Sequence, residues 1–158
     1  MMKISLAAVA VAAVGLSFAS GARSADKAPE KAKKGGAVFV PAADIKWNDV
    51  PNMAGVQIAP VEGDPGKGPS HFFIKFAGGF SAPLHHHTAN HFVTVVAGTL
   101  VLTVDGKEQK LPPGSFFTFT NKAKHATACE KGADCILSLD VRGKWDVVPE
   151  AEKPAAKK

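Results

Sequence analysis

Histidines carry most of the chemistry that this sequence offers. His85, His87 and His91 lie close together, and His125 follows further along the chain. Residues two apart in a strand point to the same face, so His85 and His87 share a face. His91 keeps that parity if the strand continues or bends through residues 88–90. Neutral imidazole is a common metal ligand that suits Zn, Cu, Fe and Ni. Three imidazoles on one face therefore predict a metal site.

Other interpretations of these histidines stay open on this evidence alone. The run 85–87 is also compatible with an exposed histidine-rich loop that scavenges metal weakly, or with ordinary polar surface. His86 has the opposite parity, so we expect it to be exposed and dispensable for metal binding. His71 falls in a predicted strand. It is either an ordinary surface or core residue or a residue that lines a pocket.

Glycines and a proline surround the histidines at regular intervals. The first set reads Gly79-x5-His85-x-His87-x3-His91-x6-Gly98, and the second reads Gly106-x5-Pro112-x-Gly114 followed by His125. This pattern resembles the two motifs of the cupin superfamily, over roughly residues 70–141. The resemblance implies an all-β fold with one cupin barrel, the RmlC-like jelly roll or double-stranded β-helix. It also implies an N-terminal extended arm, because Trp47 and Gly63-Asp-Pro resemble the arm of a group of small exported cupins.

The resemblance implies a metal site as well. The ligands it implies for one divalent transition metal (Fe, Mn, Ni, Cu or Zn) are His85, His87, His91 and His125. Family members usually have Glu at the position of His91, so here an all-imidazole shell replaces three histidines and a carboxylate. With no carboxylate to offset the metal charge, we expect an anionic or chelating small-molecule ligand. The same replacement removes the group that often serves as a base, so the sequence indicates no catalytic residue.

Three functions from different classes follow from such a site. The first is a metal-dependent enzyme of dioxygenase or isomerase/cyclase type, in which Asp64 or Glu62 of the arm supplies an acid. The second is a non-catalytic periplasmic metal or small-ligand binding or sensor protein. The third is a structural module with a vestigial site, which the intact ligand spacing argues against. Cupins with complete metal sites are mostly catalytic, so we favour the enzyme.

The elements that must position these histidines are strands. Runs rich in β-branched and aromatic residues, separated by Gly and Pro, predict strands at 71–76, 92–96, 100–104, 116–120 and 136–141. Asp105-Gly106 is typical of a two-residue hairpin turn. Many short strands indicate a sandwich or barrel. We predict one such domain over 37–148, with 41–68 as an extended arm and loop.

Several other side chains are candidates for the surroundings of the site. Phe76, Phe117 and Phe119 are expected to line or close the barrel, in most cases as plain core. Asn90 and Thr127 are candidate partners that orient a ligand imidazole; each is also compatible with an ordinary turn or strand position.

Two cysteines, Cys129 and Cys135, flank a turn-like segment at 130–134. An even pair in an exported chain predicts a disulfide, here a staple across a hairpin loop. A reactive or metal-binding pair is the alternative, although two cysteines alone make a poor zinc site.

The net charge of +5 does not indicate a nucleic-acid partner. Residues 37–149 contain ten basic and ten acidic residues, so the excess charge lies outside the predicted domain. A neutral domain has no electrostatic footprint for a phosphate backbone.

The ends of the chain predict export. A positive start, an apolar run and small residues within 1–25 are typical of a signal peptide, with an N-terminal anchor helix as the alternative. We therefore expect a periplasmic or secreted protein with no membrane association after cleavage. Residues 26–36 and 149–158 are predicted to be a disordered linker and tail. Cupin barrels often pair edge to edge, which favours a homodimer.

Overall fold

The computed structural model describes residues 36–151. The predicted signal peptide, nearly all of the predicted linker and residues 152–158 of the predicted tail lie outside this range. Among residues 36–151, no helix has the length and hydropathy that a membrane crossing requires.

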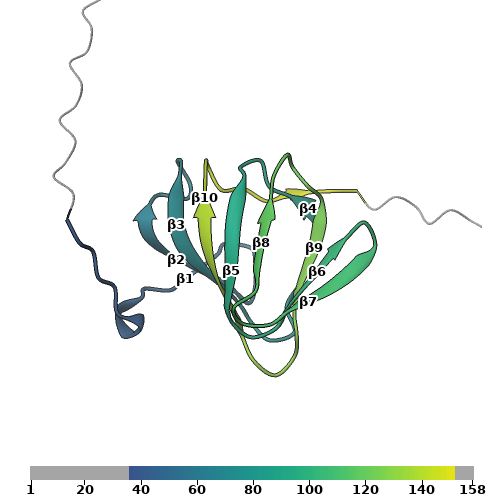
Figure 1. Ribbon diagram of the computed structural model, residues 1–158, viewed down its shortest axis with the longest axis horizontal. Helices are drawn as coiled ribbons and strands as arrows, with labels where there is room; N and C mark the ends of the chain where they lie inside the picture. The colour runs from purple at the N-terminus through teal and green to yellow at the C-terminus, as the bar shows by residue number, and fades with distance from the viewer. Residues whose placement is uncertain (1–35, 152–158) are drawn as a thin grey trace, which may run out of the picture. The chain divides into compact units, whose positions relative to one another are not determined.

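Apart from one short helix, the regular elements of the described chain are strands, as predicted (Figure 1). A short 3-10 helix, η1, precedes them. The elements are η1 (Ala42–Asp44), β1 (Asn48–Asp49), β2 (Val56–Gly63), β3 (Ser70–Phe76), β4 (Ser81–His86), β5 (His91–Ala97), β6 (Leu100–Val104), β7 (Lys107–Leu111), β8 (Phe116–Phe119), β9 (His125–Cys129), β10 (Cys135–Val141) and β11 (Val148–Pro149). All five predicted strands are present, with bounds shifted by one residue at most.

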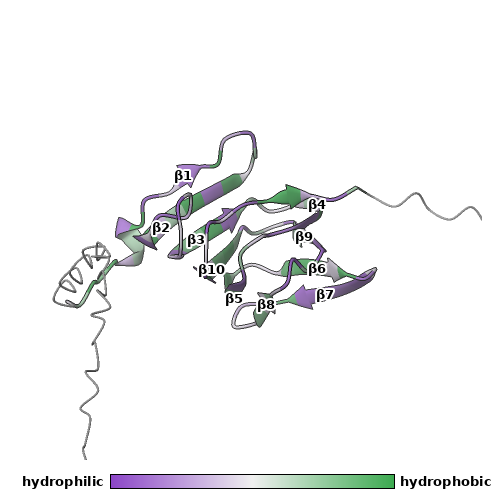
Figure 2. Cartoon of the chain, turned by 90° about the horizontal axis from the view of Figure 1, so that it is seen from above, coloured by the Kyte–Doolittle hydropathy of each residue, from purple (hydrophilic) through white to green (hydrophobic). Residues whose placement is uncertain are grey.

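Two antiparallel sheets form a cupin jelly roll. One has the order β1-β2-β3-β10-β5-β8, and the other has the order β11-β4-β9-β6-β7. Figure 2 shows the strands of the two sheets as separate groups when the molecule is viewed from above. The central strands β3 and β10 alternate buried and half-buried residues over their whole length, because each turns one face toward the core. The predicted fold class is confirmed.

The hairpin between β6 and β7 has the predicted turn. Asp105 and Gly106 both have positive φ, at 49° and 74°, and Val104 pairs with Lys107. Two central residues of positive φ are characteristic of the type I′ turn, which matches the twist of the flanking strands.

The segment 41–68 differs from its prediction. Its second half, β2, pairs along nearly its whole length with β3 and so belongs to the sheet rather than to an arm. Val56 and Ala59 are buried in the core. The pairing shifts register between Pro60 and Glu62. A bulge accommodates a proline that has no N–H for the ladder, and this explains why the strand was missed.

The predicted disulfide between Cys129 and Cys135 is present. It does not staple a hairpin, because β9 lies in the five-stranded sheet and β10 in the six-stranded sheet. The bond instead joins the two sheets across the 130–134 turn. Both cysteines are buried among core residues, which include Phe72, Leu100 and Val95.

Residues 149 and 150, which were predicted to belong to a disordered tail, are bound to β4. Pro149 pairs with His85 in the ladder between β11 and β4, and the amide of Glu150 donates to the carbonyl oxygen of Leu84. The end of the described chain therefore lies along the edge of the five-stranded sheet.

Candidate metal centre

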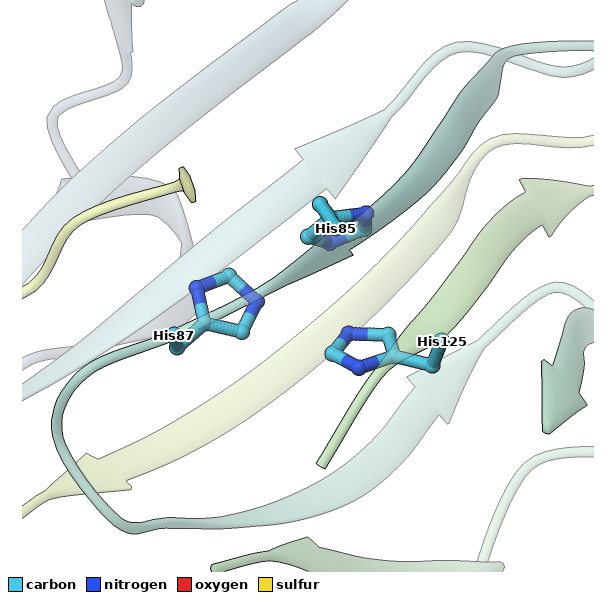
Figure 3. A group of neighbouring side chains, drawn as sticks. All are labelled: His85, His87 and His125. Atoms are coloured by element: carbon cyan, nitrogen blue, oxygen red, sulfur yellow. The ribbon is translucent and has the colours of Figure 1, made fainter. Parts of the chain in front are cut away.

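Strands β4 and β9 bring three histidines together. His85 and His125 are directly paired across these strands, and His87 follows β4 by one residue. One ring nitrogen from each of the three lies within 4.8 Å of the others, and all three residues are buried. Figure 3 shows the three rings turned toward a shared space. The sequence prediction that His85 and His87 share a face therefore agrees with the structure.

His91 borders this group from the opposite sheet. It is the first residue of β5, it is 2% exposed, and its ring centroid lies 4.7 Å from that of His87. The set whose nitrogens lie within 4.8 Å of one another consists of the other three. His91 as a fourth ligand therefore stays a prediction.

All four imidazoles are oriented by the backbone in the same way. Each Nδ1 bonds a carbonyl oxygen, and for three of them this carbonyl lies two residues before the histidine. The pairs are His85 with Pro83 (2.8 Å), His91 with Ala89 (3.1 Å), His125 with Ala123 (3.0 Å) and His87 with Asp146. A carbonyl oxygen only accepts, so Nδ1 carries the proton and Nε2 keeps its lone pair. Metal-ligating histidines have this arrangement, which fixes both tautomer and ring orientation.

Burial keeps these imidazoles neutral. It lowers the pKa of all four, to about 3 for His87 and about 4 for His125. Charge repulsion among the neighbouring imidazoles lowers these pKa values further, whereas the backbone hydrogen bonds oppose the shift. Neutral imidazole is the form that ligates metal, so the donor set fits a divalent transition metal at neutral pH.

Two aromatic side chains pack against the histidines. Trp145 stacks on His87 with ring centroids 4.0 Å apart, and its edge meets His91 at 5.1 Å. Phe119 stacks on His125 at 3.8 Å. Phe119 has the position expected from the sequence. Trp145 was not predicted, because nothing near it in the sequence marks a contact with His87, 58 residues earlier.

A cavity of about 60 Å³ lies inside the barrel next to the histidines. Apart from the four imidazoles and Thr127, the lining formed by residues 36–151 is apolar and contains no carboxylate. The lining includes Phe76, Phe80, Leu102, Phe117, Thr127, Trp145 and Val147. Phe76 and Phe117 thus have the predicted position.

The acids proposed from the arm do not reach this cavity. Asp64 is exposed and pairs with Lys67 at 2.7 Å. Glu62 is opposite His71 in the β2–β3 ladder and lines a separate surface depression. His71 itself bonds Ser138 at 3.0 Å and is absent from the cavity lining. Among the described residues, neither acid is placed to transfer a proton at the histidine cluster.

Residues 145–150, which we call the C-terminal strap, hold one side of the histidine cluster. Asp146 accepts from His87 through its carbonyl and from the Thr88 amide through its carboxylate, the latter at 2.8 Å. Glu150 pairs with His86 at 2.7 Å and with Lys124 at 2.6 Å. The strap therefore fixes the ring of His87 and covers it with Trp145.

His86 differs from its predicted exposure, whereas Asn90 lies in an ordinary loop position, which was one of its two predicted interpretations. His86 does point away from the cluster, but its side chain is only 15% exposed because Glu150 packs against it. Asn90 accepts from the Asn121 amide at 3.2 Å and makes no hydrogen bond to an imidazole. Thr127 lines the cavity.

Comparison with known proteins shows that this barrel is similar to cupins. Residues 72–142 match the family described as Cupin domain. No match to a curated protein was found.

Three solved structures illustrate the likeness of the fold. The polyketide cyclase RemF from Streptomyces resistomycificus is 17% identical, with a TM-score of 0.63 over 74% of this chain and 87% of that one. An RmlC-like cupin protein from Ralstonia eutropha is 22% identical, with a TM-score of 0.60 over 77% and 78%. KdgF from Halomonas sp. is 21% identical, with a TM-score of 0.56 over 68% and 94%. At these identities the likeness concerns the fold alone.

Proposed function

We propose that this protein binds one divalent transition metal and acts on a small chelating or anionic substrate, as a metal-dependent enzyme of dioxygenase or isomerase/cyclase type. His85, His87 and His125 would hold the metal, with His91 as the fourth ligand. The observation that carries the proposal is the common orientation of the imidazoles. Each Nδ1–H donates to a backbone carbonyl oxygen, so each Nε2 has a lone pair that can bind a metal ion.

The charge of the site supports the proposed substrate class. Burial favours the neutral form of all four imidazoles, and no carboxylate of the described part of the chain lines the cavity. A metal bound there supplies a Lewis acid and a template for ligand oxygens. The described residues of the lining offset none of the positive charge of the metal. Their apolar side chains lower the local dielectric, which strengthens the attraction between the metal and an anion. An enolate, diketonate or carboxylate therefore suits this cavity better than a cation.

The residues of this chain contribute position and exclusion of water. Trp145 and Phe119 stack on His87 and His125 and hold those rings. The apolar lining leaves few groups that bind water strongly. Fold likeness alone does not fix a reaction, but a barrel of this kind in RemF belongs to a protein described as a polyketide cyclase.

One feature favours a second candidate, a non-catalytic metal or small-ligand binding protein. Within the described lining, the groups able to transfer a proton are the imidazoles, whose Nδ1 atoms are held by carbonyls, and the hydroxyl of Thr127. A cavity with so few acids and bases is adequate for binding. If a reaction here needs a strong base, the substrate itself must supply the basic group.

Elemental analysis of protein purified from periplasm, without an affinity tag or chelator, tests the proposal. About one equivalent of Fe, Mn, Ni or Cu supports the enzyme and directs a screen of oxygen consumption with diketones, catechols and flavonols. One equivalent of zinc directs the search to isomerase, cyclase or binding roles. If the protein contains no metal and takes up none on titration, the metal site is wrong.

We also propose that the protein is exported, on the composition of residues 1–25 alone. N-terminal sequencing of protein recovered from the periplasm should begin after the small residues that end this segment. Recovery of the full-length chain from the membrane fraction would support the anchor helix instead.

A further inference from the structure

The two sheets meet along a seam between the edge strands β7 and β8. β7 ends the five-stranded sheet and β8 ends the six-stranded sheet, and no backbone ladder joins these two strands in the described chain. Side chains alone close this side of the core. Phe117 and Phe119, which point inward from β8, are the main ones, with ring centroids 5.5 Å apart.

A groove of about 530 Å³ runs along this seam, and we call it the seam groove. Charged and polar residues of β7 form part of its rim, but its floor is apolar. The apolar lining consists of Leu102, Val104, Leu111, Phe116, Phe117 and Phe119. Phe116 is 62% exposed, which is unusual for a phenylalanine on a small domain.

The seam groove adjoins the histidine cavity. Leu102 and Phe117 line both spaces, so their side chains form a wall one residue thick. Phe119 lines the groove and stacks on His125. Movement of one or two phenylalanine side chains would join the groove to the cavity without breaking a backbone hydrogen bond.

The strap side of the cavity is held more firmly. There the backbone of β11 pairs with β4, and Glu150 and Asp146 bond His86, Lys124 and Thr88. Opening that side requires these contacts to break together. The seam side therefore offers the easier route into the barrel.

From this arrangement we infer that the seam groove is an apolar subsite of the proposed metal site. The substrate has a chelating head that occupies the histidine cavity and an apolar tail that lies in the groove against Leu111 and Phe116. The inference rests on the proposed function, because the head needs the metal. The cavity of about 60 Å³ has room for only about four to six water-sized groups, so a larger substrate must extend beyond it.

A series of alkyl hydroxamates tests this subsite. The hydroxamate head is a constant chelator, and the tail grows from acetyl through hexanoyl to octanoyl. Binding to the zinc-loaded, full-length mature protein is measured by titration calorimetry. We expect affinity to rise up to about fourfold for each methylene that enters the groove, which is the usual gain from burying one such group.

Variants separate the groove from the metal. Phe116→Ser removes an exposed groove side chain that makes no contact with the histidines, and Leu111→Gln is a second groove variant. Both should bind acetohydroxamate as the wild type does but lose most of the gain with chain length. Val96→Ser is the matched control, because Val96 is also an exposed apolar side chain (48%) but does not line the groove. Its chain-length series should equal that of the wild type.

Each contrary result has its own meaning. If acetohydroxamate does not bind the loaded protein, the proposed metal site fails and the subsite with it. If acetohydroxamate binds but the series is flat, the subsite alone is overturned. If the gain with chain length is lost in Val147→Ser but kept in Phe116→Ser, the tail lies under the strap. That result would also overturn the groove as the subsite. A further contrary result combines a flat series with a dimer, measured by sedimentation, that Phe116→Ser dissociates. A second copy of the chain would then cover the groove, and the subsite would be overturned.

Discussion

At the scale of single residues, the backbone rather than other side chains orients the four imidazoles. In three of the four, Nδ1–H donates to the carbonyl oxygen two residues earlier, so the local chain conformation fixes the ring directly. His87 is the exception, because its partner is the carbonyl of Asp146 in the strap. Three of the rings are thus set locally, whereas His87 depends on a distant segment.

His87→Ala should abolish stoichiometric metal binding while the barrel stays folded. The substitution removes one of the three nitrogens that lie within 4.8 Å of one another. The ratio of metal to protein measures the loss, and circular dichroism checks the fold. His71→Ala is the control, because His71 bonds Ser138 and does not line the cavity. Full metal content in His87→Ala would show that the ligands are assigned wrongly, and the same measurement on His91→Ala tests the fourth ligand.

The metal-free protein should lose stability as pH falls from about 6.5. The pKa of His87 is held at about 3 and that of His125 at about 4, both below the ordinary value of 6.5. Above pH 6.5 these imidazoles are neutral in both states and make no difference. Below it, the unfolded chain binds protons that the folded chain rejects, so the free energy of unfolding falls.

Urea midpoints at several pH values between 7.5 and 5 measure this effect. The pKa values of Asp146 and Glu150 are lowered from 3.8 and 4.5, so their contributions are lost mainly below this window. The variant His87→Ala should show a shallower decline than the wild type. Equal slopes would mean that His87 is not buried as a neutral imidazole.

At the scale of elements, sequence periodicity found the strands that have strong β composition and missed those that lack it. β4 contains Pro83, β7 is almost entirely polar, and β9 consists largely of small residues. These strands exist because neighbouring strands pair with them, which overrides their weak local preference. Histidine spacing therefore indicated the three clustered histidines, even though the strands β4 and β9 that bring them together were not predicted.

The strap illustrates what the sequence did not reveal. Trp145, Asp146 and Glu150 meet residues of β4 and its following loop about 60 positions earlier in the chain. Such contacts leave no periodic signal within a short window. A tail rich in Lys, Ala and Pro next to it also favoured the interpretation as disorder from 149 onward.

Glu150→Ala should speed the loss of metal to excess chelator by about two- to fivefold. The change removes the ion pairs with His86 and Lys124, which solvent screens, so that they hold the strap only modestly. A looser strap lets Asp146 release the ring of His87. Chelator-driven release measured by absorbance gives the rate.

A matched variant controls for the general effect of removing an ion pair. Glu130→Ala breaks the pair with Lys110, which lies away from the strap. Its release rate should stay that of the wild type. If Glu150→Ala and the wild type also release metal equally fast, the strap does not hold His87 in place.

At the scale of the whole described domain, the two sheets are joined by a packed core and by one covalent bond. The Cys129–Cys135 disulfide links β9 to β10 across the sheets. The glycine and proline motifs predicted the β fold of this domain, because they specify the turns between its strands. They did not reveal that the cysteines bridge different sheets, since the turn between them looks the same in a hairpin and in a connection between sheets.

Reduction of the disulfide should lower the melting temperature by about 5–10 °C without release of metal. Closing so short a loop stabilises the folded state by about 2 kcal/mol, which corresponds to a shift of this size in a domain of roughly 115 residues. Differential scanning fluorimetry with and without reductant measures the shift. Release of metal on reduction would instead implicate sulfur as a ligand.

The position of the disulfide also affects which parts of the molecule open locally. Strand β9 begins at His125 and ends at Cys129, so it is held by the histidine cluster at one end and by the covalent bond at the other. β7 and β8 each have a free edge and close the seam with side chains alone. Local opening should therefore start at these edge strands, and hydrogen–deuterium exchange should find the amides of β7 fast and those of β9 and β10 slow. Local opening of β7 and β8 would admit a ligand at the seam while β9, which carries His125, keeps its position.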